Sequence, residues 1–354
     1  MSLYTSISDL LQNSGAQFRI FDMGRRISKL SSNQFEKLEQ GVIPYPTPYL
    51  HHAWLALMIW NPKEKQQNVV WFLKFPLDEQ GFLVQAVRDD FLNRLLQNMS
   101  QMIKSNEINS HEDALKNNPF SFTPDQEKMA IFHAIAADIT QLPPSQYYSN
   151  AIDYFSGKKG WDQWTELGYQ GIADLVIKAS QDEKMQALLT QSIPNLPAEP
   201  LSALCTCLEH IEPSFSLASA LQERLTRELN TAQSGYLVAA LLRGLSNTHS
   251  EEIKKQSLNA VLTSDIASNA EILAAISTRC HLVLQHPEIL NLYLEKLAHS
   301  DAGQTGFSRV LADLMFLPVM RALILQAFRN PHRSEALSSA IGLMFGTSFE
   351  QQTH

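Results

Sequence analysis

Apolar helical segments restart about every 17 residues between Ser214 and Phe345. Within each segment, apolar residues recur at spacings of three and four, which places them on one face of an α-helix. A serine or a proline stands at most of the starts, where an N-cap or first-turn residue is favoured. The sequence therefore predicts eight helices in series, which start at or next to Ser214, Ser234, Ser250, Ser268, Pro287, Gly303, Pro318 and Ser334.

A short helix with one apolar face cannot bury that face alone, so each of these helices has to pack against its neighbours. Short connections make consecutive helices antiparallel, so the eight helices form four stacked pairs. Their period is similar to that of HEAT-like repeats, whereas the Trp, Gly and Tyr pattern of TPR repeats is absent. The alternative is an irregular all-α domain with helices of similar length. The four pairs span 214–245, 250–280, 287–316 and 318–345.

The first 110 residues differ in pattern and predict a small α+β domain. Alternating residues at 16–22, a turn at Met23 and a second run at 25–30 predict a hairpin. The apolar runs 53–60 and 68–75 predict two more strands, although the Ala and Leu content of the first run would also suit the start of a helix.

Two helices and a proline-rich segment complete this predicted domain. A short helix is expected at 32–40, capped by Ser32, and the segment 42–49 is too rich in proline for a helix or a central strand. An apolar stripe over 83–103 predicts a helix that covers one face of the antiparallel sheet.

The predicted organisation therefore has three parts. An α+β domain at 1–110 is followed by a helical connector and the start of the array at 111–213, and by stacked helix pairs at 214–354. Residues 105–123 have the composition of a linker. Beyond Pro124 the chain is expected to be helical, with segments at 132–139, 147–155 and 164–177.

The distribution of charge argues against a nucleic-acid partner. Residues 1–110 hold 11 Lys or Arg and 10 Asp or Glu, whereas residues 111–354 hold 17 and 26, so the helical part is acidic. Binding to phosphates requires the opposite sign. No long apolar run exists, so neither a signal peptide nor a membrane span is predicted. Cys205, Cys207 and Cys280 are an odd number and too few for a disulfide framework, which favours a cytoplasmic location.

No sequence motif for catalysis stands out. HExxH, GxSxG and a glycine-rich phosphate loop after a predicted strand are all absent from the sequence. Cys205, Cys207 and His210 share one predicted helix, but their spacing turns them in different directions around its axis, so core positions are favoured over a metal site. No catalytic residue, metal ligand or cofactor is therefore predicted.

Aromatic and titratable residues are concentrated in the segment from Tyr45 to Trp54 (YPTPYLHHAW). Rings and imidazoles beside a loop held by prolines are typical of a binding loop, although they would also suit a covered sheet edge with a solvated His pair. Asp22, Arg25 and Arg26 flank the nearby first turn, where exposed charges that protect a sheet edge explain them equally well. The candidate binding surface comprises Tyr45, Tyr49, His51, His52, Trp54 and, after a glycine turn, Trp161.

The ordered motifs FRIFDMGRR, IPYPTPYLHHAWLA and VVWFLKFPLDEQG, followed by a helical remainder, resemble an uncharacterised bacterial family. This family is a domain of unknown function known mainly from gammaproteobacteria, and the resemblance covers essentially the whole chain. It implies a bacterial setting and no established activity, cofactor or site residue.

Two functions fit these observations. The first is a non-enzymatic protein-binding or scaffold protein that presents the surface of its array to another protein. The second is an enzyme or small-ligand sensor with a site between the α+β domain and the first helices, built from His51, His52 and His133 with Asp89 or Asp90. The first needs no motif and is favoured.

Overall fold

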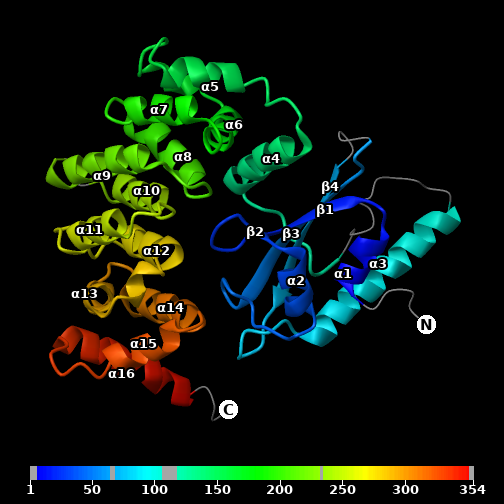
Figure 1. Cartoon of the computed structure of the whole chain (residues 1–354). Coiled ribbons are helices and arrows are strands. Elements are labelled where there is room, and N and C mark those ends of the chain that lie inside the picture. The colour runs from blue at the N-terminus through cyan, green and yellow to red at the C-terminus, as the bar shows by residue number, and fades with distance from the viewer. Residues whose placement is uncertain (1–5, 64–67, 106–117, 232–233, 351–354) are drawn as a thin grey trace. The chain divides into compact units, whose positions relative to one another are not determined.

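The structure is a computed structural model that describes residues 6–63, 68–105, 118–231 and 234–350 (Figure 1). The side chains at 99–105 and 347–350 lie outside the described part. The chain divides into two units, one of Met1–Phe132 with Ile139–Leu142 and one of His133–Asp138 with Pro143–His354. The protein is mostly helical and has a small antiparallel sheet near its N-terminus, as the sequence predicts.

The first unit contains a four-stranded antiparallel sheet in the order β2-β1-β3-β4. The predicted hairpin and the two predicted strands are confirmed, and the first apolar run is a strand throughout. Residues 55–58 of the central strand β3 are fully buried because both faces of the sheet are covered. The strands are β1 (Gln17–Asp22), β2 (Ser28–Leu30), β3 (His52–Trp60) and β4 (Asn68–Pro76).

Two helices cover opposite faces of this sheet. On one face, Phe91 of α3 (Gln85–Ser105) contacts Phe75 of β4, with ring centroids 5.4 Å apart. On the other face, Phe132 of α4 (Gln126–Thr140) lies 5.3 Å from the ring of Phe72 and 5.4 Å from that of Phe21. The predicted cover by the helix near 83–103 is confirmed, and the start of α4 supplies the second cover.

A buried carboxylate joins the two remaining helices of this unit, α1 (Ile7–Asn13) and α2 (Ser32–Glu39). Glu39 is 0% exposed and accepts hydrogen bonds from the backbone N–H groups of Ile7 and Ser8 at the start of α1. The first turn of a helix leaves such N–H groups without a partner inside the helix, and a negative charge there is stabilising. Helix α1 was not predicted, and the N-cap of α2 is Ser31 where Ser32 was predicted.

The outer edge of β4 pairs with a later segment of the chain. The N–H of Lys74 donates to the carbonyl of Phe120 (2.7 Å), and the N–H of Phe122 donates to the carbonyl of Phe72 (3.1 Å). Part of the predicted linker at 105–123 therefore belongs to the sheet, because main-chain groups at a strand edge need partners. Residues 106–117 of that linker lie outside the described residues.

The second unit is helical. Its first part contains α5 (Tyr148–Phe155), the short 3₁₀ helix Gln163–Glu166, α6 (Tyr169–Ala179), α7 (Glu183–Ser192) and α8 (Ala198–Leu208). The next helices are α9 (Phe215–Asn230), α10 (Gly235–Leu245), α11 (Glu251–Leu262) and α12 (Ala270–Arg279). The last are α13 (Pro287–Ala298), α14 (Gly303–Met315), α15 (Met320–Ala327) and α16 (Glu335–Glu350).

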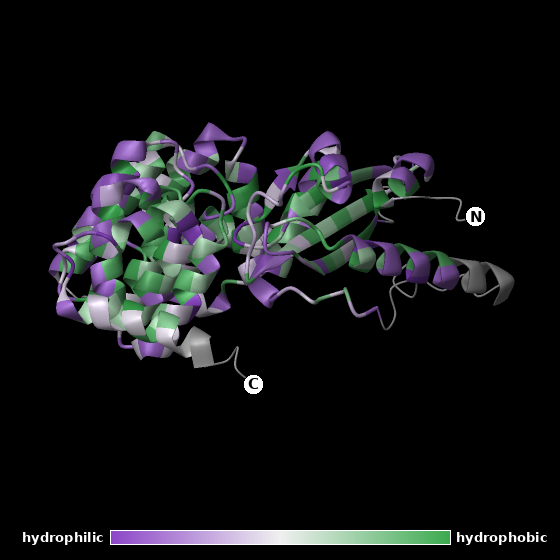
Figure 2. Cartoon of the chain, turned by 90° about the horizontal axis from the view of Figure 1, so that it is seen from below, coloured by the Kyte–Doolittle hydropathy of each residue, from purple (hydrophilic) through white to green (hydrophobic). Residues whose placement is uncertain are grey.

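These helices pack in two rows, each in chain order (Figure 1). One row runs α5, α7, α9, α11, α13 and the other α6, α8, α10, α12, α14, while α15 and α16 pack on α13 and α14. The second row is the more apolar: α10 buries eight of its residues, from Leu237 to Leu245. Figure 2 shows largely apolar strands in the first unit and helices that alternate between apolar and polar residues.

The predicted helix starts are mostly confirmed by side-chain caps. The hydroxyls of Ser214, Ser234 and Ser250 each accept a hydrogen bond from the backbone N–H three residues later, at 3.3, 3.4 and 3.3 Å. Pro287 is the first residue of α13. The N-cap of α12 is Asn269 where Ser268 was predicted, because its side chain accepts from two N–H groups. Helix α15 begins at Met320, two residues beyond the predicted Pro318.

The helix predicted at 164–177 starts later than expected. The backbone is extended at Leu167 and Gly168, and α6 begins only at Tyr169. A Cβ on Gly168 would lie 3.2 Å from the ring of Tyr147, so glycine suits this close approach. No helix among the residues with assigned placement is both long and apolar enough to cross a membrane.

Candidate binding surfaces

Asp22, at the end of β1, is a buried carboxylate that holds the proline-rich segment in place. One of its oxygens accepts from the N–H of Gly24 (2.8 Å) and the other from the hydroxyl of Thr47. Burial raises the pKa of Asp22, although these hydrogen bonds act in the opposite direction. The fully buried Tyr45 hydroxyl lies between Asp22 and the carbonyl of Trp54, and burial together with Asp22 raises the pKa of Tyr45.

Arg25 fixes the same segment from the other side of the turn after β1. Its Nε donates to the carbonyl of Pro48 (2.9 Å), and its guanidinium carbon lies 5.6 Å from the centroid of the Tyr49 ring. Asp22 is 1% exposed and Arg25 is 2% exposed, so the interpretation of these residues as exposed edge charges is wrong. A buried charge requires polar partners, and the proline-rich segment supplies them.

The segment leads into a tight turn at Tyr49 to His52. The N–H and carbonyl groups of Tyr49 and His52 pair reciprocally at 3.1 Å, and both central residues have positive φ angles, 50° at Leu50 and 61° at His51. Turns of this geometry favour Asn-Gly, and bulky residues adopt such angles at a cost of about 1 kcal/mol or more each. A hydrogen bond to a residue outside the turn helps to hold this strained conformation, because the carbonyl of His51 accepts from the N–H of Leu77 (3.0 Å).

The structure divides the predicted binding residues of this loop between interior and surface. Tyr45 is buried, and the half-buried ring of Trp54 lies between Phe122 (4.8 Å between centroids) and the ammonium of Lys74 (4.2 Å from the centroid). His52 is half-buried, and burial lowers its pKa. His51 is exposed, Tyr49 is half-buried, and Leu50, which was not predicted, is 52% exposed at the tip of the turn.

The residues of the alternative catalytic hypothesis are not assembled within the first unit. His52 shares a sheet face with Trp54, whose register partner is Lys74, whereas α3 packs on the opposite face through Phe75. Asp89 and Asp90, both on α3, form ion pairs with Arg88 (2.7 Å) and Arg94 (2.9 Å), and His133 is assigned to the second unit. Among the described residues, no group of three or more His, Cys, Asp or Glu could hold a metal ion.

Trp161, the last predicted binding residue, is half-buried in the second unit. Its ring lies 5.9 Å from that of Tyr154, and its carbonyl accepts from the Tyr154 hydroxyl (2.8 Å). Burial, with a contribution from Asp162, raises the pKa of Tyr154 to about 12. Gly157 has a φ of 77°, and a Cβ there would lie 3.1 Å from the Trp161 ring, so this ring also packs on the glycine turn.

The helical unit presents a second candidate surface. Antiparallel packing places the connections α6–α7, α8–α9, α10–α11 and α12–α13 along one edge, which we term the loop edge. Neighbouring connections are joined by hydrogen bonds: the Gln186 side chain accepts from the N–H of Ser214 (2.8 Å), and the Asn247 side chain donates to the carbonyl of Ile211 (2.7 Å). These bonds fix the spacing of the loop edge from the start of α7 to the α10–α11 connection.

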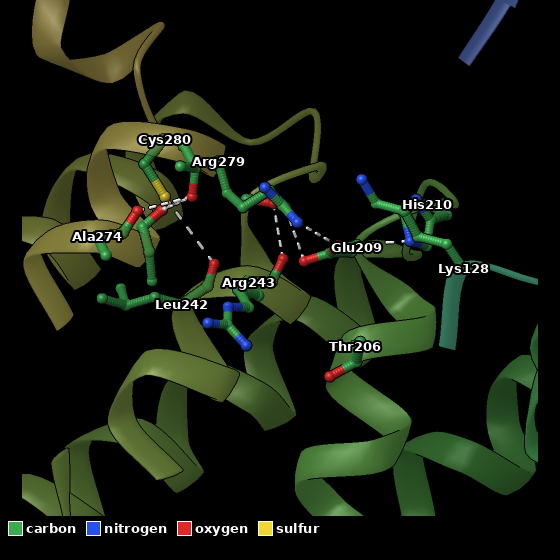
Figure 3. A network of polar contacts seen from close by, with 12 residues as sticks. Lys128, Thr206, Glu209, His210, Leu242, Arg243, Ala274, Arg279 and Cys280 are labelled. Carbon is green, nitrogen blue, oxygen red and sulfur yellow. Dashed lines mark hydrogen bonds and ion pairs between the residues drawn. The ribbon is translucent and has the colours of Figure 1, made fainter. Parts of the chain in front are cut away.

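A buried ion pair spans two of these connections (Figure 3). Arg279 at the end of α12 donates from Nη2 to Oε1 of Glu209 (2.9 Å), and its Nε lies 2.9 Å from Oε2. Burial acts to raise the pKa of Glu209, but Arg279 and His210 outweigh it and hold that pKa below its usual range. Cys280, next in the chain, is buried and lies 3.9 Å from the carbonyl of Leu242.

Two grooves open at the loop edge. One, of about 580 Å³, lies between α7 and the start of α9, and the other, of about 590 Å³, lies between α11 and the start of α13. Two large apolar side chains are exposed at the same edge, Phe215 at 70% and Leu282 at 60%.

No sequence motif marks these features, because exposure depends on which neighbours the packed helices provide. The only signal was the predicted helix start at Ser214, which places Phe215 next to an N-cap.

Comparison with known proteins gives one match. A family model described as a protein of unknown function (DUF3549) matches residues 3–345. No curated protein matches the chain, and no solved structure matches it.

Proposed function

The chain belongs to the DUF3549 family, whose description assigns no activity, and we propose that it is a non-enzymatic protein-binding or scaffold protein that uses the surface of its helical array. The observation that carries this proposal is the loop edge, with two grooves and the exposed side chains of Phe215 and Leu282. Large exposed apolar side chains, particularly aromatic ones, are typical anchors of protein interfaces.

The two-row packing supports the same proposal. Helices stacked in series, as in helical-repeat proteins of the HEAT type, produce a long surface on which a partner makes contacts over several pairs. The buried pair of Glu209 and Arg279 and the hydrogen bonds between connections hold the spacing of that surface. A surface of fixed geometry loses little conformational entropy when a partner binds, which favours affinity.

The alternative, an enzyme or small-ligand sensor, has less support. His52 and the α3 carboxylates Asp89 and Asp90 lie on opposite faces of the sheet. The binding surface predicted at Tyr45, Tyr49, His51, His52, Trp54 and Trp161 stays a prediction, to which the turn adds the exposed Leu50. A bacterial cytoplasmic setting also stays a prediction, and the buried free thiols of Cys205, Cys207 and Cys280 are in keeping with it.

The test is an affinity capture with the full-length protein as bait and a matched pair of variants. Phe215→Ser with Leu282→Ser removes the apolar side chains from the loop edge, whereas Tyr236→Ser removes a 50% exposed ring at the opposite end of the helix pairs. We expect at least one polypeptide to be retained by the wild type and the Tyr236 variant and lost from the loop-edge variant. Equal retention of every polypeptide by all three proteins would contradict the proposal.

A further inference from the structure

We propose that the groove between α7 and α9 binds an extended segment of a partner polypeptide that carries lysine or arginine. This inference rests on the proposed function and assigns the chemistry of the partner at one place on the loop edge. Its support comes from the shape of the groove, the polar groups that line it, its charge, and the exposed ring next to it.

The shape of the groove suits an extended chain. One wall is a single face of α7, where Glu183, Gln186, Ala187, Thr190 and Gln191 follow each other at helical spacings, and the opposite wall is the start of α9. A volume of about 580 Å³ lies within the range of binding pockets for small ligands and short peptide segments. Small side chains at Ala179 and Ala187 leave this space open.

The lining offers partners for a peptide backbone. Gln191 and Ser216 are exposed, and their amide and hydroxyl groups can both donate and accept hydrogen bonds. An extended segment makes no hydrogen bonds within itself, so its N–H and C=O groups have to find partners in the groove. The Gln186 side chain already accepts from the N–H of Ser214, which fixes the distance between the two walls.

The charge of the groove selects a cation. Asp182 and Glu183 lie at the start of α7, and both are exposed. The side chains that line this groove include these two carboxylates and no lysine, arginine or histidine. The groove between α11 and α13 differs, because Lys255 lies there together with Glu252 and Glu288. Complementary charge contributes mainly to specificity and to the rate of association, so the α7–α9 groove favours a basic segment.

Phe215 adds an exposed apolar side chain next to the groove. It stands between the groove-lining Ser214 and Ser216 and is 70% exposed. The aliphatic part of lysine or arginine packs well on such a ring, and a guanidinium group also stacks on it. Phe215 therefore complements the two carboxylates for the same type of side chain.

The experiment selects random 12-residue peptides displayed on phage against the full-length protein and measures the binding of the selected peptides by fluorescence anisotropy. We expect enrichment of lysine and arginine. Asp182→Asn with Glu183→Gln removes both charges and keeps the N-cap acceptor of α7, and should weaken binding roughly 3- to 10-fold. Phe215→Ala should weaken it about tenfold. The matched control, Asp265→Asn with Glu271→Gln near the start of α12 at the opposite edge, also removes two exposed charges and should leave affinity within about twofold.

Three results would overturn the assignment: no peptide is selected, the selected peptides are not basic, or they bind the neutralised α7 variant as tightly as the wild type. Failure here is distinguishable from failure of the proposed function. If the captured polypeptide is still lost when Phe215 and Leu282 are changed, the loop edge binds a partner by other means and only the basic segment is wrong. If that capture is also unaffected, both proposals fail.

Discussion

Arg279, the last residue of α12, forms a two-point ion pair with Glu209, which follows α8, and the intervening helix α10 packs against both α8 and α12. The carboxylate is 2% exposed and the arginine side chain 14%. Removing charges from water is costly, and the hydrogen bond from Nη2 to Oε1, together with the short Nε–Oε2 ion-pair contact, offsets that cost. The pair therefore constrains three helices rather than two.

Breaking this pair on one side should destabilise the array. Arg279→Met leaves the Glu209 carboxylate buried without its main partner, so we expect the free energy of unfolding in urea to fall by about 3 kcal/mol. The double variant with Glu209→Gln should recover most of this loss, because no charge is then buried. Equal stabilities of the single and double variants would contradict this account.

Asp22 should give a stability difference that depends on pH. Its pKa is raised in the folded protein, so the folded state binds the proton more strongly, and the wild type gains stability as the pH falls through that pKa. Asp22→Asn does not titrate. We expect the stability of Asp22→Asn minus that of the wild type to be larger at pH 7 than at pH 4 in urea titrations. A difference independent of pH, or one that grows in acid, would show that the carboxyl group is not desolvated.

The strained turn at Leu50 and His51 should accept the residues that its geometry favours. Leu50→Asn with His51→Gly lowers the strain energy at the two positive φ angles, and we expect it to raise the free energy of unfolding by about 1–2 kcal/mol. The control Leu50→Ala with His51→Ala keeps the strain and should change stability by less than about 0.5 kcal/mol. Calorimetric unfolding measures both. A loss of stability in the Asn-Gly variant would mean that the two side chains contribute more than the strain costs.

Substitution by alanine should change the stability of the second unit in opposite directions at two of its glycines. A Cβ on Gly171 would lie 2.5 Å from the carbonyl oxygen of Tyr147, so Gly171→Ala should lower stability by about 1–3 kcal/mol through overpacking between α5 and α6. Gly342, inside α16, has no atom within 4 Å of that position. Gly342→Ala should raise helix stability by about 0.5–1 kcal/mol. Helical circular dichroism during thermal unfolding distinguishes the two effects, and changes of the same sign would contradict the prediction.

The helices of the array were predictable because each is specified locally. Ser214, Ser234 and Ser250 cap their helices as the sequence indicates, since a cap depends on residues within one turn. The break before α6 is different: Gly168 packs closely on Tyr147, which lies 21 residues earlier, and local sequence gives no sign of this contact. The pairing of β4 with residues 120–122 is also long-range, and a composition typical of a linker gives no sign of it.

The candidate site was less predictable than the fold. Aromatic and charged residues beside prolines are typical of exposed loops and sheet edges, yet Tyr45 and Asp22 are both buried in one hydrogen-bonded group. The loop edge was missed for a different reason. Phe215 is an ordinary apolar residue at a helix start, and its 70% exposure depends on which neighbours the packed helices provide.

The pairing of residues 120–122 with β4 sets a lower limit on the size of an N-terminal fragment that stays monomeric. A fragment cut at residue 110 would expose the main-chain groups of Phe72 and Lys74 along one side of the sheet, a template on which further copies could add strands. It would also lack Phe132 and uncover the rings of Phe21 and Phe72. An expression fragment should therefore continue past the first turns of α4, well beyond the point at which the sequence pattern changes.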